Sequence, residues 1–185
     1  NQQATATPGT FVGIELNGAS LTSAAGAVLL QGRGGDTADG NHGIYAHNSA
    51  VISSTGTSVT TATITLTGSG GSGSSGGVVL ADAGSSVNTV EAPIVIAGTG
   101  PAHGVLLQNA ARINATGAAS IALHGEGTDS GPGIQIDSTI AGAGGTVTVT
   151  SEDDVRFGGA GLIDSAAGQV SVIADAAPGS GGGRI

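Results

Sequence analysis

Carboxylates are the side chains of this sequence that are best placed for chemistry. Glu152, Asp153 and Asp154 are consecutive, and Asp164 follows them closely. Glycosidases need two carboxyl groups on opposite sides of the scissile bond. In an extended strand Glu152 and Asp154 would share a face, because alternate residues point the same way. The cluster also interrupts the repeat pattern described below, so we expect an exposed turn there rather than a catalytic pair.

A polysaccharide-cleaving enzyme, either a hydrolase or a lyase, is the main enzymatic alternative. Polygalacturonase-like sites carry an Asp-Asp pair followed by Gly-His-Gly, whereas here His103-Gly104 and His124-Gly125 precede Asp153-Asp154. A lyase needs a basic residue beside a sugar acid, but the arginines are scattered along the chain. They are Arg33, Arg112, Arg156 and Arg184. A formal net charge of −9 would also repel acidic glycans, and we therefore expect a non-enzymatic protein with no catalytic residues.

Oxygen ligands for a metal ion are concentrated in one loop. Asp36, Asp39 and Asn41 could contact calcium, together with Asp129 if its loop stacks at the same corner. Asp and Asn beside Gly are also ordinary turn-forming residues, and the Gly-Gly-x-Gly-x-Asp nonapeptide of calcium-binding β-rolls is absent. The histidines have no helical ligand spacing either, and they are His42, His47, His103 and His124. We expect neither a metal site nor a cofactor.

Three further binding patterns are weak. Threonine alternates in 61–67 and 146–150, as in ice-binding solenoids, but the pattern is missing from other units and Thr favours strands in any case. Tyr45 is the one aromatic ring expected on the outward face of a strand, which leaves little for the stacking of sugars or bases. Asn114-Ala-Thr116 matches a glycosylation sequon, a motif that chance readily produces.

The composition limits the fold as much as the function. The chain has 185 residues with 36 Gly, no Cys, one Tyr and two Phe, so its core must consist of small aliphatic side chains without disulfides. A net charge of −9 without any lysine argues against nucleic acid or an anionic membrane as a partner. No apolar window predicts a membrane span, and the first residues carry no signal-peptide pattern. A mean hydropathy of +0.25 and short alternating runs of Val, Ile and Leu oppose disorder.

An internal repeat organises the chain. Each unit opens with Gly-aliphatic-x-aliphatic, and the copies begin at Gly13, Gly43, Gly77, Gly104 and Gly133. A second element, aliphatic-x-aliphatic-x-Gly-x-Gly, begins at Val28, Ile64, Ile94 and Ile121. Between the two elements lies a lone aliphatic residue, which is Leu21, Ile52, Val87 or Ile113. Each unit is therefore predicted to contain three short strands.

Stacking of these units gives the fold. Alternation places Ile121 and Leu123 on one face of a strand and Ala122 and His124 on the other, and no helical periodicity is present. One unit cannot bury its own apolar face, but a stack of units can. We predict an all-β fold, a parallel β-helix (β-solenoid) of five to six turns in a single domain, 1–185. The units are 13–42, 43–76, 77–103, 104–132, 133–158 and 159–175, followed by a Gly-rich tail, 176–185.

Length variation between the units falls at one corner, directly after the third strand. The insertions are 33–42, 69–76, 99–103 and 126–132. Glycine is expected at the corners because the chain changes direction there, often at positive φ. Loops of variable length should project from one edge of the solenoid, where binding surfaces are commonly built.

The repeat resembles those of filamentous-haemagglutinin-type exoproteins. The similarity lies in the Gly-[Ile/Val]-x-[Leu/Ile] strand, the Asn or Asp after it and the Ile/Leu-x-Gly-x-Gly exit, and it covers roughly residues 11–175. The resemblance implies a right-handed parallel β-helix displayed outside a bacterial cell, exported by two-partner secretion or as an autotransporter passenger. β-Helix repeats also occur in pectin-degrading enzymes and phage tailspikes, so the pattern indicates architecture more than function.

Neither 1–10 nor 176–185 has the pattern of an amphipathic cap. We expect a segment of a longer exoprotein, and the alternative is a fibre subunit whose ends stack on other copies. The predicted function is a non-enzymatic, extracellular, structural or adhesive β-solenoid of the bacterial cell surface. Expected partners are flanking repeats or other copies, and surface or host glycans and proteins, with neither nucleic acid nor membrane insertion.

Overall fold

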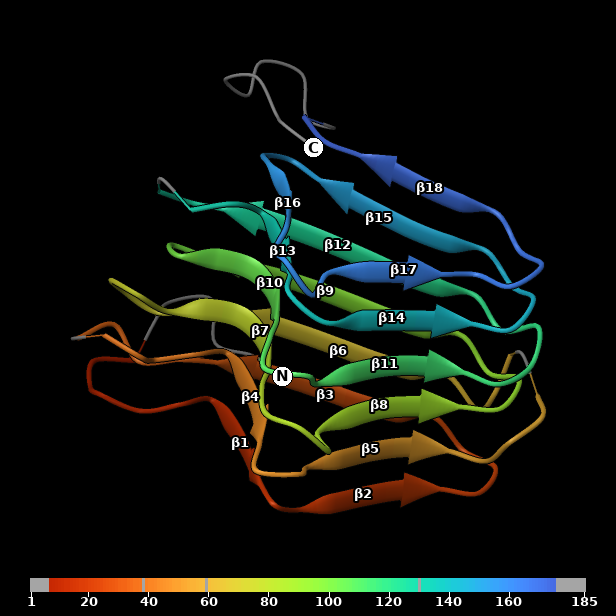
Figure 1. The fold of residues 1–185 in the computed structure, drawn as a ribbon. Helices are drawn as coiled ribbons and strands as arrows, with labels where there is room; N and C mark the ends of the chain where they lie inside the picture. The colour runs from red at the N-terminus through yellow and green to blue at the C-terminus, as the bar shows by residue number, and fades with distance from the viewer. Residues whose placement is uncertain (1–6, 38, 59, 130, 176–185) are drawn as a thin grey trace.

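The computed structural model describes residues 7–37, 39–58, 60–129 and 131–175, in which the chain forms a β-solenoid (Figure 1). Eighteen strands, β1 to β18, make up this part of the chain. They form six turns of three strands, and each strand pairs in parallel with its equivalents in the neighbouring turns. The predicted all-β, parallel β-helix of five to six turns is therefore confirmed. The right-handed coil implied by the resemblance stays a prediction.

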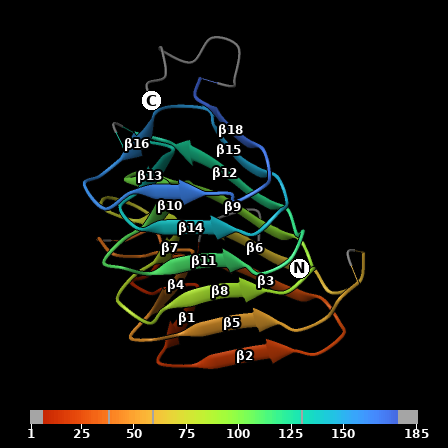
Figure 2. The same ribbon diagram turned by 45° about the vertical axis from the view of Figure 1, so that its right-hand side comes forward.

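The three strands of each turn belong to three sheets. Sheet A contains β1 (Ile14–Asn17), β4 (Ile44–His47), β7 (Gly76–Leu80), β10 (His103–Leu107), β13 (Ile134–Ile136) and β16 (Val155–Phe157). Sheet B, whose strands are stacked one above another in Figure 2, contains β2 (Ser20–Ser23), β5 (Val51–Ser54), β8 (Ser86–Thr89), β11 (Arg112–Ala115), β14 (Thr139–Gly142) and β17 (Leu162–Asp164). Sheet C contains β3 (Val28–Arg33), β6 (Ile64–Ser69), β9 (Ile94–Gly100), β12 (Ile121–Gly127), β15 (Val147–Ser151) and β18 (Val170–Ile173).

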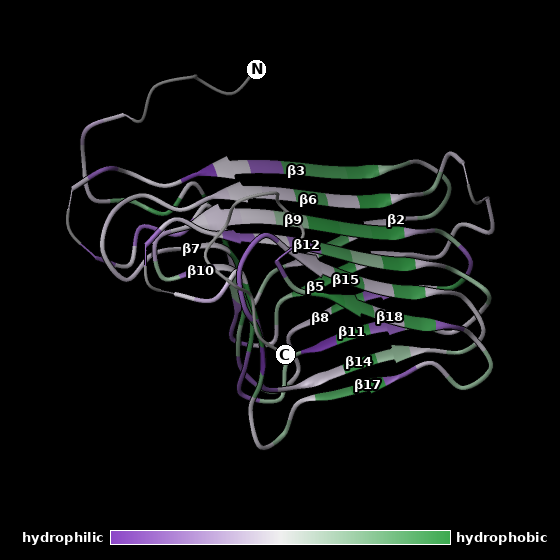
Figure 3. Cartoon of the chain, turned by 90° about the horizontal axis from the view of Figure 1, so that it is seen from above, coloured by the Kyte–Doolittle hydropathy of each residue, from purple (hydrophilic) through white to green (hydrophobic). Residues whose placement is uncertain are grey.

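Core side chains form columns because equivalent residues of successive turns are neighbours in the sheets. In sheet C, Ile64, Ile94 and Ile121 are aligned in register and fully buried. The lone aliphatic residues form a matching column in sheet B, from Leu21 to Ile163. Figure 3 shows the hydrophobic halves of β3, β6 and β9 side by side, with their polar and Gly-rich ends continuing beyond. Burial of each such side chain contributes about 1.5–3 kcal/mol, so these columns hold the turns together.

Glycine has a different role at the corner between sheets C and A from the one expected. Gly98 lies in β9 and Gly104 in β10, and a Cβ on either residue would overlap the backbone of the other. Neither has positive φ, so the expectation of positive φ is wrong for these repeat glycines. Glycine is needed there because no side chain fits between the two backbones. A Cβ on Gly32, Gly68 or Gly125 would likewise overlap the backbone of Gly43, Gly77 or Gly133, respectively.

Positive φ occurs at the corner between sheets A and B, and also at Gly40 and Gly73 within the loops between sheets C and A. Gly18, Asn48, Asp82 and Asn109 have φ values of 61°, 61°, 74° and 55°. Asn and Asp tolerate this left-handed region better than most residues, because their short side chains bond locally. The turn geometry therefore explains the choice of Asn48, Asp82 and Asn109 after the first strands of their units.

The sixth turn begins earlier than predicted. β16 pairs with β13, with Val155 opposite Ile134, so residues 155–158 open this turn instead of closing unit 133–158. Asp154 stands where the other units have their opening glycine, and the absence of that glycine hid the strand.

Length variation at the corner between sheets C and A is confirmed, but the prediction that it falls at one corner is wrong, because 55–63 join β5 to β6 at the corner between sheets B and C whereas 90–93 join β8 to β9 there. Residues 34–43 join β3 to β4, whereas 101–102 alone join β9 to β10. β9 and β12 extend to Gly100 and Gly127, so part of each predicted insertion is strand. No helix of the described residues is long and apolar enough to cross a membrane. The predicted tail 176–185, with Arg184, lies outside the described residues.

Candidate functional site

The acidic cluster forms a tight turn between β15 and β16. Asp153 accepts a hydrogen bond from the backbone N–H of Gly127 at 2.8 Å, and Asp154 pairs with Arg156 at 3.1 Å. Asp164 lies on β17 in sheet B, so the structure places it on a different face. The carboxylates of the turn thus bind groups of the chain itself, which fits the predicted turn.

The two His-Gly segments are also separated. His103 lies in β10 of sheet A and His124 in β12 of sheet C. His124 lies beside Glu152, with 3.5 Å between Nε2 and the carboxylate, and both side chains are more than a third exposed. This pair links two neighbouring turns on the outer side of sheet C and is open to solvent.

The oxygen-rich loop ties turns together. The carboxylate of Asp39 accepts a hydrogen bond from the N–H of Ser74 at 3.0 Å, in the loop of the next turn. Asn41 is buried and donates from its side chain to a carbonyl within its own loop at 2.6 Å. Asp36 and Asp129 are exposed. Among the described residues, no group of three or more His, Cys, Asp or Glu side chains is arranged to hold a metal ion.

The outer side of sheet A carries an aromatic cluster, which we call the sheet A face. Tyr45 stacks on His47 with ring centroids 4.1 Å apart and an angle of 8° between the rings. His47 in turn lies 2.9 Å from Glu15 in the first turn. Burial, together with the charges of Asp82 and Glu15, raises the pKa of Tyr45. Tyr45 is outward-facing, as predicted, but its ring already has a partner.

Two more histidines extend the sheet A face. His42 accepts a hydrogen bond at Nδ1 from the N–H of Gly76 at 2.9 Å. Nε2 of His103 lies 3.1 Å from the side-chain oxygen of Gln135, whose amide donates to Asp137 at 2.6 Å. Burial lowers the pKa of His42, and the neighbouring His103 lowers it further. Burial also lowers the pKa of His103, although the hydrogen bond to Gln135 opposes the shift. Both rings therefore favour the neutral form.

An apolar cluster lies beside these rings and was not predicted. Val79, Ala81 and Leu106 are only 1%, 1% and 8% exposed, and Tyr45 packs against them. The signal was present in the sequence, since Val79 and Leu106 stand at outward positions where other units have polar residues. The sheet A face is therefore a second, smaller core, in which the rings and apolar side chains are packed or hydrogen-bonded.

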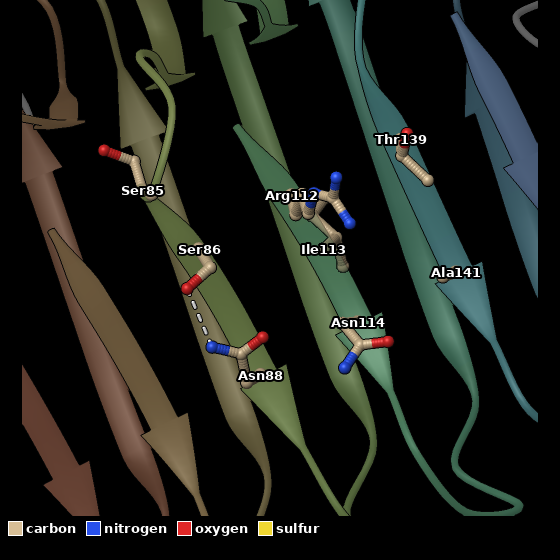
Figure 4. Close-up of a pocket in the computed structure, with 9 residues that line it drawn as sticks. Ser85, Ser86, Asn88, Arg112, Ile113, Asn114, Thr139 and Ala141 are labelled. Atoms are coloured by element: carbon tan, nitrogen blue, oxygen red, sulfur yellow. Dashed lines mark hydrogen bonds between the residues drawn. The ribbon is translucent and has the colours of Figure 1, made fainter. Parts of the chain in front are cut away.

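The outer side of sheet B is different, because it contains an open hollow of about 280 Å³ (Figure 4). We call this hollow the sheet B groove. Its outward-facing lining consists of Ser86, Asn88, Arg112, Asn114, Thr139 and Ala141. These residues form two columns across β8, β11 and β14. One column contains Ser86, Arg112 and Thr139, which are aligned in register. The other column lies two residues further along each strand and contains Asn88, Asn114 and Ala141.

A second hollow, of about 330 Å³, adjoins the groove. The two share Asn114 and Ala141, and the second one reaches Thr116 and Asp164. Asn114 of the sequon is half-buried and lines both hollows. Sequence reasoning named Arg112 and Asn114, which lie two residues apart in β11, but did not join them to Ser86 and Thr139 of the neighbouring turns.

The threonine rows do not form a continuous surface. Thr65 and Thr148 occupy one column of sheet C, but Val95 and Ala122 lie between them. This agrees with the weak ice-binding signal in the sequence. A flat threonine array is not built on this sheet.

Comparisons with protein-family models, with curated proteins and with solved structures find no match to this chain. The resemblance to filamentous-haemagglutinin-type repeats therefore rests on the repeat pattern alone.

Proposed function

We propose that this chain is a non-enzymatic structural and adhesive β-solenoid, a segment of a large extracellular protein on a bacterial cell surface. Its role is to form a stiff rod that carries binding faces along its length. The observation that supports this role most directly is the unbroken register of three sheets through six turns. The repeat pattern that resembles secreted exoproteins supports the extracellular location.

Stiffness follows from how each turn is held. Every middle turn is hydrogen-bonded to two neighbours through all three sheets, and one hydrophobic cluster continues from Val28 to Val155. Stability of this kind is a sum of contacts between neighbouring repeats, so it extends with each added turn. No disulfide is required, since the chain has no Cys.

A fibre subunit is the second candidate, since the first and last turns present apolar side chains that another copy would cover. Ile14 and Leu16 in the first turn, and Ile163 and Val172 in the last, are only partly buried. The equivalent side chains of the middle turns are fully buried. A further turn, from flanking sequence or from another copy, would cover these side chains and pair with the open strand edges.

The intact mass of the denatured native protein distinguishes the two candidates. A mass many times 17.2 kDa supports the segment. A mass near 17.2 kDa, with fibres that grow with concentration in electron micrographs, supports the fibre subunit. A mass near 17.2 kDa with a monomer at every concentration contradicts both.

The enzymatic alternative is tested separately. The chain is incubated with a panel of plant and microbial polysaccharides, and new reducing ends are measured. We expect no release. Release that Glu152→Gln or Asp154→Asn abolishes, and that the exposed-loop variant Asp36→Asn retains, would show catalysis at the acidic turn and contradict the proposal.

A further inference from the structure

We propose that the sheet B groove binds a sparsely charged acidic glycan. In this complex Arg112 holds the carboxylate of a hexuronate unit, and the amides and hydroxyls around it hold sugar hydroxyls. The inference rests on the proposed adhesive function, because it names the ligand class of one face of the rod.

The shape of the groove suits an extended ligand. It crosses three neighbouring strands, β8, β11 and β14, so it runs along the solenoid axis. Neighbouring strands are about 4.8 Å apart, which gives a floor of about 10 Å. That length is comparable with a disaccharide. The adjoining hollow at Asn114 and Ala141 continues the path toward the last turn.

The polar groups of the groove are available to a ligand. Arg112 is exposed and forms no ion pair with the described residues, and the side chains of Asn114 and Thr139 have no hydrogen-bond partner among them. Asn88 donates to Ser86 at 2.7 Å, which leaves its side-chain oxygen as an acceptor. Figure 4 shows these side chains on the same side of three adjacent strands. The groove therefore offers donors and an acceptor within one hollow.

The chemistry of these groups selects a carboxylate next to hydroxyls. Of the residues that line the groove, all of them described, Arg112 is the one with a charge. A planar guanidinium binds a planar carboxylate through two parallel hydrogen bonds. Amide and hydroxyl side chains match the alternating donors and acceptors of a sugar ring. No aromatic side chain lines the groove, so polar contacts must supply the specificity.

The charge of the whole chain limits how acidic the ligand is. Thirteen carboxylates and a net charge of −9 create a negative field that repels a polyanion. A glycan with a charge on every unit would meet one arginine and this field. A polymer in which a hexuronate alternates with a neutral N-acetylhexosamine places one carboxylate at Arg112 and a neutral unit beside it.

The test is a titration of the full chain with a tetrasaccharide of alternating glucuronate and N-acetylglucosamine. Side-chain N–H signals are followed by NMR, and the dissociation constant is measured by calorimetry. We expect saturable shifts at Arg112 and Asn114. The dissociation constant should be about tenfold lower than those of a neutral N-acetylglucosamine tetrasaccharide and of a fully sulfated heparin tetrasaccharide.

Matched variants separate the groove from general charge. Arg112→Gln should raise the dissociation constant about tenfold and remove the preference for the acidic tetrasaccharide over the neutral one. The dissociation constant of Arg112→Lys should lie between those of the parent chain and of Arg112→Gln. Arg156→Gln removes the same charge from sheet A and should leave the constant within about twofold. Equal melting temperatures of the variants establish that each has folded.

Three results would overturn the proposal. They are absence of binding, equal binding of the neutral probe, and equal weakening by Arg156→Gln. Each of them leaves the structural role of the rod intact. Cleavage of the tetrasaccharide during the titration would instead contradict the proposed function.

Discussion

The sheet A face and the sheet B groove lie on one solenoid with one register, yet their outward side chains are used in opposite ways. On sheet A, Tyr45 and His103 contact other side chains, and Leu106 is 8% exposed. On sheet B, Arg112 and Asn114 line an open hollow without partners among the described residues. The repeat fixes where a side chain stands. The neighbours in its column decide whether it stabilises the rod or is left for a ligand.

The largest loss of stability is expected from a substitution in the hydrophobic core that both faces share. Ile121→Asp should lower the free energy of unfolding by roughly 4 kcal/mol or more, because it buries an unpaired charge. Ala122→Asp, one residue away on the opposite side of β12, should cost less than about 1 kcal/mol. Thermal melts followed by far-UV circular dichroism measure both. A melt of Ile121→Asp that matches the parent would show that Ile121 does not face the core.

Close backbone contact at the corner between sheets C and A should make added bulk costly there, whereas the groove should tolerate it. Gly98→Ala places a methyl group against the carbonyl of Gly104 and should cost about 3 kcal/mol. Ala141→Val adds a larger group to the open groove and should change stability by less than about 0.5 kcal/mol. Urea unfolding midpoints compare the two. Equal costs would mean that the corner is as open as the groove.

Truncation should distinguish the two faces directly. Leu106→Ala should cost about 2 kcal/mol, since it removes a nearly buried side chain from the sheet A face. Asn114→Ala, in the groove, should stay within about 0.5 kcal/mol. Both are read from denaturant unfolding. If the groove variant lost as much as the sheet A variant, Asn114 would be a structural residue.

The smallest expected effect is a dependence of stability on pH that belongs to sheet A. Burial lowers the pKa of His42 and His103 in the folded state below the ordinary value of 6.5. The unfolded chain therefore binds more protons as the pH falls through that value, and stability decreases until the folded pKa values are reached. Unfolding midpoints between about pH 7.5 and 5.5 measure this decrease.

The control for the pH effect is a double variant. His42→Gln with His103→Gln should flatten the profile, whereas Arg112→Gln in the groove should leave its slope unchanged. The other charged groups near His103 are Arg156, which lowers its pKa, and Asp137, which raises it. An unchanged slope in the double variant would place the titrating groups elsewhere.

The sequence predicts the stack well because its signal is local. Ile94 and Ile121 each precede a Gly-x-Gly, so their units align by inspection, and the structure places them in register. The sixth opening strand was missed because Asp154 replaces the glycine that marks it. Where the repeat is regular, the pattern within single units is enough to predict the strands and their alignment.

The two faces were not predicted, although single outward residues such as Val79 and Leu106 carried a signal, because their contacts join neighbouring turns in space. Leu106 and Val79 come together only once the turns are aligned, and the same is true of Arg112 and Thr139. Inserted loops of different length separate these residues in the chain. Partners of outward side chains depend on this alignment and on rotamers, which single-unit patterns do not contain.

The glycine contacts between sheets C and A allow the connections at this corner to differ in length. The backbones of the paired glycines are in close contact both where the connection is 34–43 and where it is 101–102. A change in the length of such a connection therefore leaves the paired glycines in contact, and the neighbouring turns keep their alignment. This corner is therefore a suitable insertion site for foreign peptides in peptide display. In evolution it is the place where the chain can acquire new segments while the rod is inherited intact.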